Sequence, residues 1–339
     1  MVLLLNAAEV EGLISMEDAI ALMDQVAREE VAGTTVHMAP FGGAHARPPG
    51  LPPAPAGSAA HRESGVLRAV GGGAYGVGRV GIRVGGVSLV FATAGNELLG
   101  IVGSGYSNLR VGALVGLAAR AFARADAHAV ALLGSGRLAL SALEGLCAIG
   151  SIERISVYSP TREHREAFAR RAAAALKVPV TAMETREAAL DGADIVALGT
   201  NSSAAVIRED DIPPGTHVTS WGEPFEIDAS VYAKAALVVV SSWRLEYAMI
   251  DPKGQYLAER KGLGPPPLWT LLSEGRLARE KVVELGAVAA GSSPAPTSRD
   301  AITVFRESQG GAGDIALAGL AFDRAKALGR GVEYDFLTG

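Results

Sequence analysis

The sequence has almost no cysteine and few aromatic residues. Cys147 is the single cysteine among 339 residues, so no disulfide can form within the chain. Aromatic residues make up 5% of the chain, whereas hydrophobic residues make up 49%. The core must therefore be built mainly from Ala, Val, Leu and Ile. Cys147 falls in a run with helical character, where a small buried side chain is more common than a reactive thiol.

Several other features are missing, and each absence argues against a class of protein. No apolar run approaches the ~18 residues of a membrane span, and the N-terminus has no basic start or cleavage-like site. We therefore expect a cytoplasmic protein. The formal net charge of −5 gives no electrostatic reason to bind nucleic acid or a membrane surface. The six histidines form no H-E-x-x-H pattern, so we predict no metal site.

Glycine, in contrast, is abundant, and one glycine-rich turn organises the sequence. The apolar run Ala129–Leu133 predicts a buried strand, and a Leu/Ala-rich helical run begins at Ala139. Between them the sequence follows the G-x-G-x-x-G/A order of a dinucleotide-binding turn. The following helix N-terminus offers free N–H groups to phosphates. We predict that the cofactor contacts Gly134, Ser135, Gly136, Arg137 and Leu138; the alternative is an ordinary glycine turn.

Strand-like and helix-like runs alternate after this turn. The strand candidates are Ile155–Tyr158, Val178–Thr181, Ile195–Leu198, Val218–Trp221 and Leu237–Ser241, with helices at Glu163–Leu176 and ending near Leu190. This alternation predicts an α/β protein with a doubly wound parallel sheet. Before the turn, β-like runs lie between Val66 and Leu99 and a helix is expected over Tyr106–Ala125.

The segment 39–65 is crowded with Pro, Gly, Ala and His. Such a composition builds little regular structure, and the segment is long for a loop in a compact domain. We expect it to be mobile or to act as a lid over a site.

Four stretches together make the chain resemble the ornithine cyclodeaminase/mu-crystallin family. They are SNLRVGALVGLAARAFAR (107–124), LLGSGRLAL (132–140), DGADIVALGTNS (191–202) and AITVFRESQGGAGDIALAGLAFDRA (301–325). The resemblance implies a Rossmann NAD(P)-binding domain over residues 126–299. It also implies a second α+β domain for substrate and dimerisation, built from residues 1–125 and 300–339. Homodimers and a site between the domains are implied as well.

The sequence departs from the family pattern at two places. The family usually has a lysine in a G-V-K motif near the substrate, whereas here Gly78 stands at that position and Arg79 follows. A family aspartate beyond the fourth Rossmann strand falls in a shortened segment, where Glu223 is the nearest acidic residue. These departures make the scaffold better supported than the chemistry.

Three residues are candidates for catalysis. Arg110 matches the family arginine that holds a substrate carboxylate, a task suited to the guanidinium fork, although it could be a surface arginine. Arg79 and Arg83 alternate with apolar residues along a predicted strand, so both would project from one face; one of them could supply the cation lost with the lysine, or both could be exposed charges. Glu223 follows a predicted strand, where it could act as an acid, a base or an imine-stabilising anion, or be an ordinary loop carboxylate.

The end of the second predicted strand indicates which cofactor is preferred. NAD-binding Rossmann domains place a carboxylate there to bind the ribose hydroxyls, but this chain has Ser159, Thr161 and Arg162. Two hydroxyls and an arginine suit a 2′-phosphate, so we predict NADPH, with NAD as the alternative. The hydroxyls could also merely cap the next helix. Further cofactor contacts are expected after later strands, at Thr200, Asn201, Ser202, Trp221 and Gly222.

The leading functional prediction is an NADPH-dependent oxidoreductase acting on C–N bonds. It would reduce an imine or ketimine, or act like an amino-acid dehydrogenase, on an amino, imino or keto acid. One alternative is a mu-crystallin-like NAD(P)-binding protein with little catalysis, which holds a ligand or a partner. A second is an NAD-dependent cyclodeaminase, against which the loss of the lysine counts.

Overall fold

The structure, a computed structural model, describes residues 1–38, 41–46, 64–103, 106–150, 152–248, 264–293, 296, 298–308 and 310–335. The chain forms two compact units, each of which is described by itself. The terminal unit comprises Met1–Leu13, Thr35–Tyr106 and Gly310–Gly339, and the central unit comprises Ile14–Thr34 and Ser107–Gln309.

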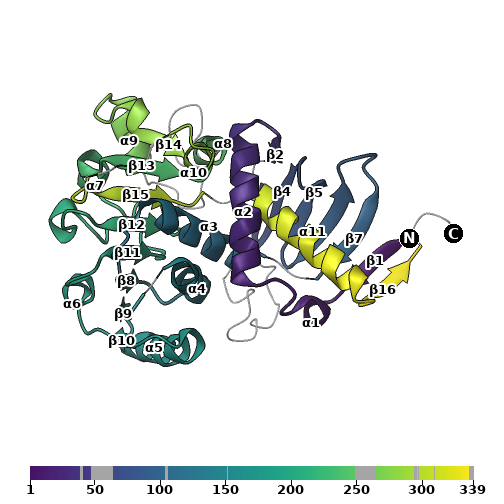
Figure 1. Cartoon of the computed structure of the whole chain (residues 1–339), viewed down its shortest axis with the longest axis horizontal. Helices are drawn as coiled ribbons and strands as arrows, with labels where there is room; N and C mark the ends of the chain where they lie inside the picture. The colour runs from purple at the N-terminus through teal and green to yellow at the C-terminus, as the bar shows by residue number, and fades with distance from the viewer. Residues whose placement is uncertain are drawn as a thin grey trace. The chain divides into compact units, whose positions relative to one another are not determined.

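The central unit is built on an eight-stranded sheet with the order β10-β9-β8-β11-β12-β15-β13-β14 (Figure 1). All its strand pairs are parallel, which confirms the predicted doubly wound sheet. The strands are β8 (Ala129–Leu133), β9 (Arg154–Tyr158), β10 (Val180–Ala182), β11 (Ile195–Leu198), β12 (His217–Ser220), β13 (Leu237–Val240), β14 (Val282–Glu284) and β15 (Thr303–Arg306).

The central unit also contains helices, most of which connect these strands. They are α2 (Met16–Val31), α3 (Ser107–Phe122), α4 (Ala139–Ile149), α5 (Arg162–Leu176), α6 (Arg186–Leu190), α7 (Ala229–Lys234), α8 (Trp243–Ala248), α9 (Pro267–Ser273) and α10 (Leu285–Ala289), with 3₁₀ turns at Glu209–Asp211 and Arg279–Lys281. Ser15 begins α2 with a capping box to Asp18, which satisfies N–H groups that a helix start leaves unbonded. Within the described residues, no helix is long and apolar enough to cross a membrane.

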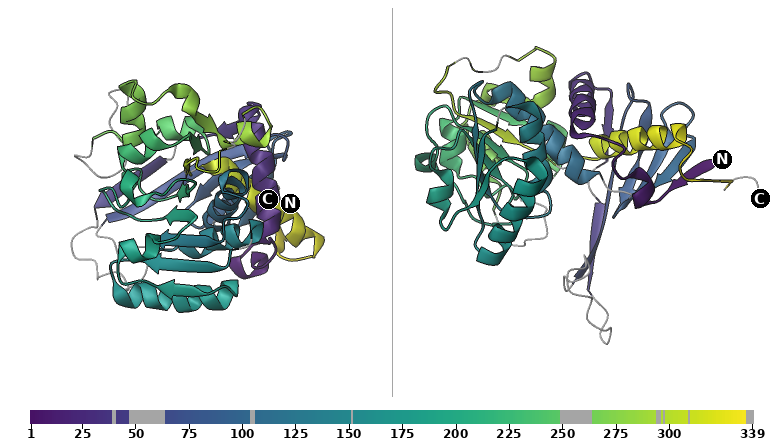
Figure 2. Two further views of the ribbon diagram at one scale, coloured as in Figure 1. Left: turned by 60° about the vertical axis from the view of Figure 1, so that its left-hand side comes forward. Right: turned by 60° about the horizontal axis from the view of Figure 1, so that its bottom comes forward.

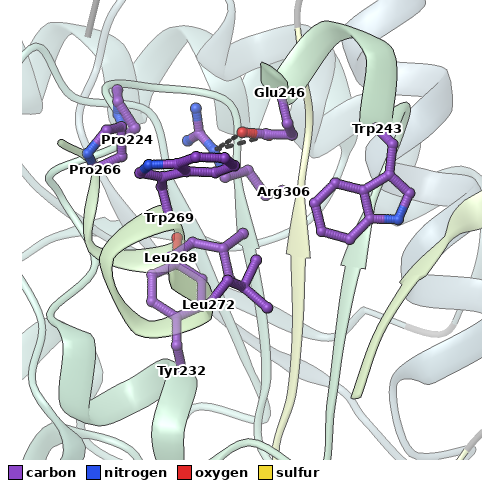
Figure 3. A pocket seen from close by; sticks show the side chains of 9 residues that line it. All are labelled: Pro224, Tyr232, Trp243, Glu246, Pro266, Leu268, Trp269, Leu272 and Arg306. Carbon is purple, nitrogen blue, oxygen red and sulfur yellow. Dashed lines mark hydrogen bonds and ion pairs between the residues drawn. The ribbon is translucent and has the colours of Figure 1, made fainter. Parts of the chain in front are cut away.

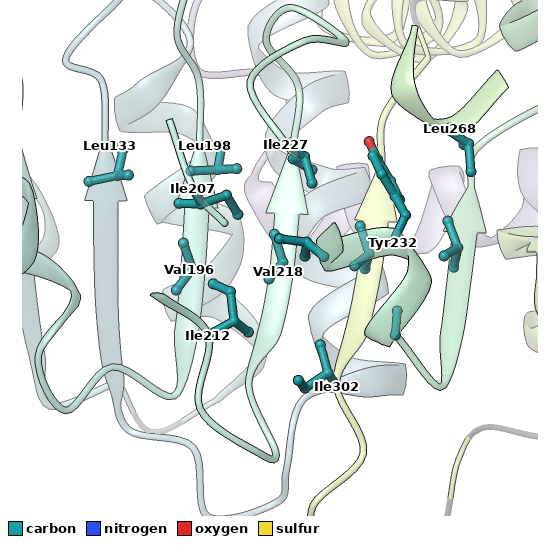
Figure 4. Close-up of a cluster of buried hydrophobic side chains, with 14 of the residues drawn as sticks. Leu133, Val196, Leu198, Ile207, Ile212, Val218, Ile227, Tyr232, Leu268 and Ile302 are labelled. Carbon is teal, nitrogen blue, oxygen red and sulfur yellow. The ribbon is translucent and has the colours of Figure 1, made fainter. Parts of the chain in front are cut away.

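The core of the central unit lies between the sheet and its connecting segments (Figure 4). Side chains from the strands, such as Val196 and Val218, meet Ile207, Ile212 and Ile227 from the connections, and all five are buried. Because a parallel sheet is covered on both faces, strands such as β8, β11 and β13 consist of continuous apolar runs rather than alternating ones. Burial on both faces therefore explains the short apolar runs in the sequence.

The boundaries of the units differ from the predicted 125/126 and 299/300 divisions. β15 (Thr303–Arg306) inserts between β12 and β13, so it belongs to the central sheet rather than to the terminal unit. The helices α2 and α3 also belong to the central unit. They do so because α3 packs closely against α4 and α2 packs against α3, which sequence periodicity alone does not reveal.

The terminal unit has its own eight-stranded sheet, in which β16, β1, β7, β6, β5, β4 and β2 lie in that order and β3 pairs with β4. The strands are β1 (Val2–Leu5), β2 (Thr35–His37), β3 (Phe41–Ala46), β4 (Ser64–Ala74), β5 (Arg79–Val84), β6 (Val87–Ala92), β7 (Leu98–Val102) and β16 (Val332–Tyr334), and the helices are α1 (Ala7–Val10) and α11 (Gly311–Ala327). The β-like runs expected between Val66 and Leu99 are thus confirmed.

The helix α11 covers one face of this second sheet (Figures 1 and 2). Two ion pairs attach it to β5: Arg79 to Asp323 at 2.6 Å and Arg83 to Asp314 at 2.9 Å. The two arginines therefore do project from one face of the strand, as their spacing predicts.

The prediction for segment 39–65 is wrong in part. Residues 41–46 form β3, which pairs antiparallel with β4 in a register running from Phe41↔Ala69 to Ala46↔Ser64. This stretch contains no proline, so each of its residues keeps the N–H that a strand pairing requires. Residues 39–40 and 47–63, on which the expectation of a mobile segment or lid also rests, lie outside the described residues.

Candidate functional site

The glycine-rich turn lies at the carboxyl end of β8, where open α/β sheets bind their ligands. Gly134 has φ +108°, and a Cβ there would lie 2.6 Å from the carbonyl oxygen of Gly199. Its N–H donates to the carbonyl of Tyr158 at 2.9 Å. Only glycine can occupy this position without strain, because the φ is positive and the backbone of the next strand end is close.

Gly136 differs from Gly134 in a way that bears on ligand binding. A Cβ at Gly136 would meet only the Gly199 carbonyl oxygen, at 3.9 Å, so packing within the chain does not require glycine there. The missing side chain instead leaves backbone exposed beside the start of α4. Leu138, the N-cap of that helix, makes no side-chain cap hydrogen bond. Exposed backbone and an uncapped helix start are the features that a pyrophosphate needs, so these residues fit a dinucleotide.

Neighbouring segments hold this turn in place. The Ser135 hydroxyl donates to the Ser159 hydroxyl at 3.0 Å, which joins the end of β8 to the end of β9. A guanidinium nitrogen of Arg137 donates to the side-chain oxygen of Asn108 in the first turn of α3. Arg110 on α3 is therefore anchored close to the turn.

The segment after β9 brings Ser159, Thr161 and Arg162 together, as the sequence predicts. Thr161 is the N-cap of α5 but makes no side-chain cap hydrogen bond, and Ser159 is bonded to Ser135, so the capping alternative is not what the structure shows. Arg162 is exposed and pairs with Glu166 at 2.7 Å. Arg165 is buried and donates to the carbonyl of Ser159 at 3.2 Å. This hydrogen bond fixes the backbone of the segment between β9 and α5.

Glu226, which sequence reasoning missed, holds the ends of β11 and β12. Its carboxylate is fully buried and accepts from the Thr200 N–H at 2.9 Å, the Thr200 hydroxyl at 2.8 Å and the Ser220 hydroxyl at 2.7 Å. The Gly222 N–H donates to it at 3.2 Å. Burial raises the pKa of Glu226, and the hydrogen bonds from Ser220 and Thr200 act in the opposite direction.

This carboxylate therefore shapes the loops in which Thr200, Asn201, Ser202, Trp221 and Gly222 were predicted. Trp221 is buried against Gly199, where a Cβ would lie 2.5 Å from the indole ring, so it packs under the loop. The Ser202 N–H donates to the Thr200 hydroxyl at 3.2 Å, and Asn201 between them is exposed. The Glu223 N–H donates to the carbonyl of Thr200 at 3.2 Å, and its side chain is only partly buried.

Arg110 and Glu307 form a buried ion pair beside these loops. A guanidinium nitrogen of Arg110 donates to Oε1 of Glu307, and both side chains are at most 5% exposed. Glu307 directly follows β15, and its N–H donates to the carbonyl of Ser220 at 2.8 Å. Its Oε2 is buried without a hydrogen-bond partner in the described part of the chain.

Glu307 was also missed at the sequence level. The signal was present, because the run Ile302–Phe305 overlaps the strand β15 (Thr303–Arg306), and a carboxylate that directly follows such a strand falls at the ligand edge of the sheet. The resemblance to the family placed this stretch in the terminal domain, so the run was not interpreted as a Rossmann strand.

Arg79 and Gly78 lie in the terminal unit. Gly78, at the position of the family lysine, has φ +76° in a turn where its N–H donates to the carbonyl of Ala74 at 3.0 Å. A lysine there would be strained, so the departure in sequence accompanies a turn that favours glycine. Arg79 is engaged with Asp323, and a catalytic role for it stays a prediction.

A pocket lies at the ends of β13 and β15, lined by Pro224, Tyr232, Trp243, Glu246, Pro266, Leu268, Trp269, Leu272 and Arg306 (Figure 3). Arg306 pairs there with Glu246 at 3.0 Å, and the Ser308 hydroxyl donates to Glu246 at 2.6 Å. Successive residues of a strand point to opposite faces. Arg306 accordingly faces this apolar pocket, whereas Glu307 faces Arg110.

Metal and thiol chemistry find no support in the described part of the chain. No group of three or more His, Cys, Asp or Glu side chains there is arranged to hold a metal ion. Burial, and after it the nearby Glu144, raises the pKa of the Cys147 thiol to about 11. A thiol with so high a pKa is a poor nucleophile at neutral pH.

Comparison with known proteins gives the context for this geometry. The model of the ornithine cyclodeaminase/mu-crystallin family matches residues 2–329. A Delta(1)-pyrroline-2-carboxylate reductase from Bacillus cereus is 27% identical over 198 residues, which cover 57% of this chain and 56% of that protein. The matches thus span little more than half the length of the curated relatives.

Two solved structures share the whole fold. That of Thermococcus litoralis Delta(1)-pyrroline-2-carboxylate reductase, in complex with NADH and L-proline, has a TM-score of 0.80 at 20% identity and covers 98% of this chain and 100% of its own. The structure of a protein described as a probable ornithine cyclodeaminase, from Bordetella pertussis, has a TM-score of 0.76 at 24% identity and covers 97% of this chain and 98% of its own. Identities this low establish the fold alone. Because the family model spans residues 2–329, the chain belongs to the ornithine cyclodeaminase/mu-crystallin family.

Proposed function

We propose that the protein is an NADPH-dependent oxidoreductase that acts on C–N bonds. The observation that carries the proposal is the turn at Gly134–Leu138, whose exposed backbone at Gly136 and uncapped helix start lie at the ligand edge of the sheet. The Delta(1)-pyrroline-2-carboxylate reductases among the relatives favour reduction of an imine or ketimine over other redox reactions. The reverse reaction, oxidation of an amine, is the same chemistry.

The residues fall into two groups in this proposal. Gly134–Leu138 bind the pyrophosphate, Ser159, Thr161 and Arg162 bind the 2′-phosphate, and the loops containing Thr200–Ser202 and Trp221–Gly222 border the rest of the cofactor. When bound, a reduced nicotinamide supplies a hydride to the carbon of a C=N bond. Arg110 lies at the substrate end, where the sequence predicts that it orients a carboxylate, and Glu223 is placed to handle a proton.

The test is NADPH oxidation by the purified full-length protein with a panel of cyclic imino acids, and of α-keto acids together with an amine. Turnover on at least one member, with loss of binding and turnover when Gly136 is changed to Val, is the expected result. The Val side chain would fill the space through which the pyrophosphate of the cofactor approaches the backbone of residue 136. NADPH binding without turnover on any member of the panel would contradict the enzymatic proposal.

That outcome would favour a second candidate, an NAD(P)-binding protein with little catalysis. Two observations support it: glycine stands at the position of the family lysine in a turn with φ +76°, and Arg79 is engaged with Asp323. The cyclodeaminase alternative is disfavoured by the same two observations, because that chemistry depends on the full set of family residues.

The proposal includes a homodimer formed through the terminal sheet. In the antiparallel pairing of β5 with β6, Val80 lies opposite Phe91 and Ile82 lies opposite Leu89. These residues point away from the face that α11 covers, since Arg79 and Arg83 alternate with them and bind that helix. All four are only partly buried. A second copy of the chain would cover this apolar face, and light scattering of wild type and Ile82→Glu would detect a dimer that the charge disrupts.

A further inference from the structure

The pocket at the ends of β13 and β15 is separate from the residues assigned to the proposed reaction. In the central sheet, β11, β12 and β15 lie between β13 and β8, the strand that precedes the glycine turn. Strands in a sheet lie ~4.8 Å apart, so roughly 19 Å separates β13 from β8. Arg306 lines the pocket, and the next residue, Glu307, points to the opposite face and pairs with Arg110. The pocket therefore lies on the face of the sheet opposite Arg110.

The walls of this pocket are apolar and aromatic. Besides the indole rings of Trp243 and Trp269, two prolines and two leucines line it, namely Pro224, Pro266, Leu268 and Leu272 (Figure 3). The guanidinium of Arg279 stacks on Trp243, 3.8 Å from the ring centroid, and holds that indole in place. The space among the lining side chains, counted out to its open mouth, is about 330 Å³. This volume is at the small end of the range for ligand pockets, so the walls suit a single ring that packs against the indoles.

The charged side chains of the pocket neutralise each other. Nε of Arg306 lies 3.0 Å from Oε1 of Glu246, and the Ser308 hydroxyl donates to the same oxygen at 2.6 Å. The two charged side chains are at most 15% exposed. A further charge brought in beside this pair would lose its hydration next to charges that are already balanced. The pocket therefore favours a neutral ligand.

One polar group in the pocket has unused hydrogen-bonding capacity. The Tyr232 hydroxyl is buried and has no hydrogen-bond partner in the described part of the chain. Figure 3 shows this hydroxyl turned toward Leu268 and Trp269. Burial raises the pKa of Tyr232, so the phenol keeps its proton at neutral pH and can donate it. A buried hydroxyl without a partner is costly, and an acceptor atom on a ligand would relieve that cost.

We propose that this pocket binds a small neutral molecule that has one aromatic ring and a carbonyl oxygen. The ring packs among Trp243, Trp269 and Leu272, and the oxygen accepts a hydrogen bond from Tyr232. The proposal goes beyond the proposed function, because the pocket shares no residue with the proposed cofactor and substrate sites. Tyr232 selects for the acceptor, and the indole walls select for the ring.

The test uses two probes of nearly equal shape on the full-length protein. Acetophenone has the ring and the carbonyl, and in α-methylstyrene a methylene group replaces the carbonyl oxygen. Ligand-observed NMR titration gives the affinity of each probe for wild type and for Tyr232→Phe. Wild type should bind both probes. The variant should bind acetophenone at least ~5-fold more weakly and bind α-methylstyrene as well as wild type or better, because only acetophenone loses a hydrogen bond.

Tyr75→Phe is the matched control, because it removes the same hydroxyl from an exposed tyrosine of the terminal unit. It should change neither affinity. Leu272→Trp places a larger side chain in the pocket and should abolish the binding of both probes. Tyr232→Phe should be as stable as wild type in urea, since the hydroxyl that it removes has no partner.

Four results would overturn the inference: no binding of acetophenone to wild type, an acetophenone affinity that Tyr232→Phe leaves unchanged, binding that survives Leu272→Trp, or a marked loss of stability in Tyr232→Phe. The last would mean that the hydroxyl is already hydrogen-bonded in the unliganded protein. Acetophenone is also titrated in the presence of saturating NADP⁺, and loss of its binding there would place the probe in the cofactor site instead. A protein that binds acetophenone as expected but binds neither NADPH nor NADP⁺ would contradict the proposed function and support this inference.

Discussion

Gly112 on α3 and Gly145 on α4 meet backbone to backbone where the two helices cross. A Cβ on Gly145 would lie 1.9 Å from the carbonyl oxygen of Gly112, and a Cβ on Gly112 would lie 2.2 Å from that of Ser141. This crossing fixes α3 against the helix that follows the glycine turn. It therefore sets the position of Arg110, which lies two residues before Gly112, relative to the proposed cofactor site.

Gly145→Ala is expected to destabilise the protein by at least ~1–3 kcal/mol, because the methyl group forces apart two helices that the core otherwise holds together. Gly150→Ala is the control, since a Cβ at Gly150 meets nothing within 4 Å. Urea unfolding followed by circular dichroism measures both. Equal stability of the two variants would show that the crossing relaxes easily and does not position α3.

Glu226→Gln should weaken dinucleotide binding and lower stability together. The carboxylate accepts four hydrogen bonds from the ends of β11 and β12, two on each oxygen. In the glutamine variant an NH₂ group replaces one of these oxygens and cannot accept the two hydrogen bonds that this oxygen received. The donors left unpaired cost about 1–3 kcal/mol. Chemical unfolding and fluorescence titration with NADPH detect the two effects, and exposed Glu209→Gln is the control. Unchanged cofactor affinity would mean that these loops do not shape the binding edge.

The elements that a local sequence pattern reveals were predictable, whereas the order of the strands, which depends on contacts between distant segments, was not. β8 begins and ends where its apolar run does, at Ala129 and Leu133, because burial on both faces of the sheet favours an unbroken apolar strand. β15 is as deeply buried although it contains Thr303 and Arg306. Its place between β12 and β13 depends on pairing with strands more than sixty residues away in the chain. No local pattern encodes that partner.

The candidate site divides in the same way. The turn at Gly134 was recognised because its residue order is local and its φ of +108° requires glycine. Glu226 and Glu307 were missed because their importance comes from burial and from partners contributed by other segments. The shortened segment after β12 contains two nearby carboxylates that differ in exposure: Glu226 is fully buried and Glu223 is only partly buried. The sequence shows both but not which is buried.

His217 should make stability depend on pH. It is fully buried at the start of β12, its Nδ1 lies 2.8 Å from the Thr303 hydroxyl, and burial lowers its pKa to about 3 from 6.5. Between these two values the unfolded chain binds a proton that the folded chain does not. The contribution of neutral His217 is therefore complete above pH ~6.5 and is lost as pH falls toward 3, with a slope of up to ~1.4 kcal/mol per pH unit.

Replacing His217 by Asn removes this slope, and replacing the exposed His164 on α5 by Asn provides the control. The free energy of unfolding, measured in urea from pH 5 to pH 7, should rise with pH in wild type and in the control and be flatter in His217→Asn. Parallel pH curves for all three proteins would mean that folding does not lower the pKa of His217.

Cofactor choice tests how the proposed site reads the 2′-phosphate. After β9, Ser159 is buried and bonded to Ser135, whereas Arg162 is exposed at the start of α5 and is held by Glu166 at 2.7 Å. No carboxylate stands at the strand end to repel the phosphate. NADPH should therefore bind at least tenfold more tightly than NADH, equivalent to ~1.4 kcal/mol.

Arg162→Ala should erase most of that preference, because it removes the cation that faces the phosphate. Arg170, which is exposed two turns further along α5, is the control, and Arg170→Ala should not change the preference. Glu166→Gln should increase the preference, since the carboxylate that now competes for Arg162 is gone. Fluorescence titration with NADPH and with NADH gives the ratio of the two affinities for each variant. Equal affinities in wild type, or a ratio that Arg162→Ala leaves unchanged, would mean that the segment after β9 does not read the 2′-phosphate.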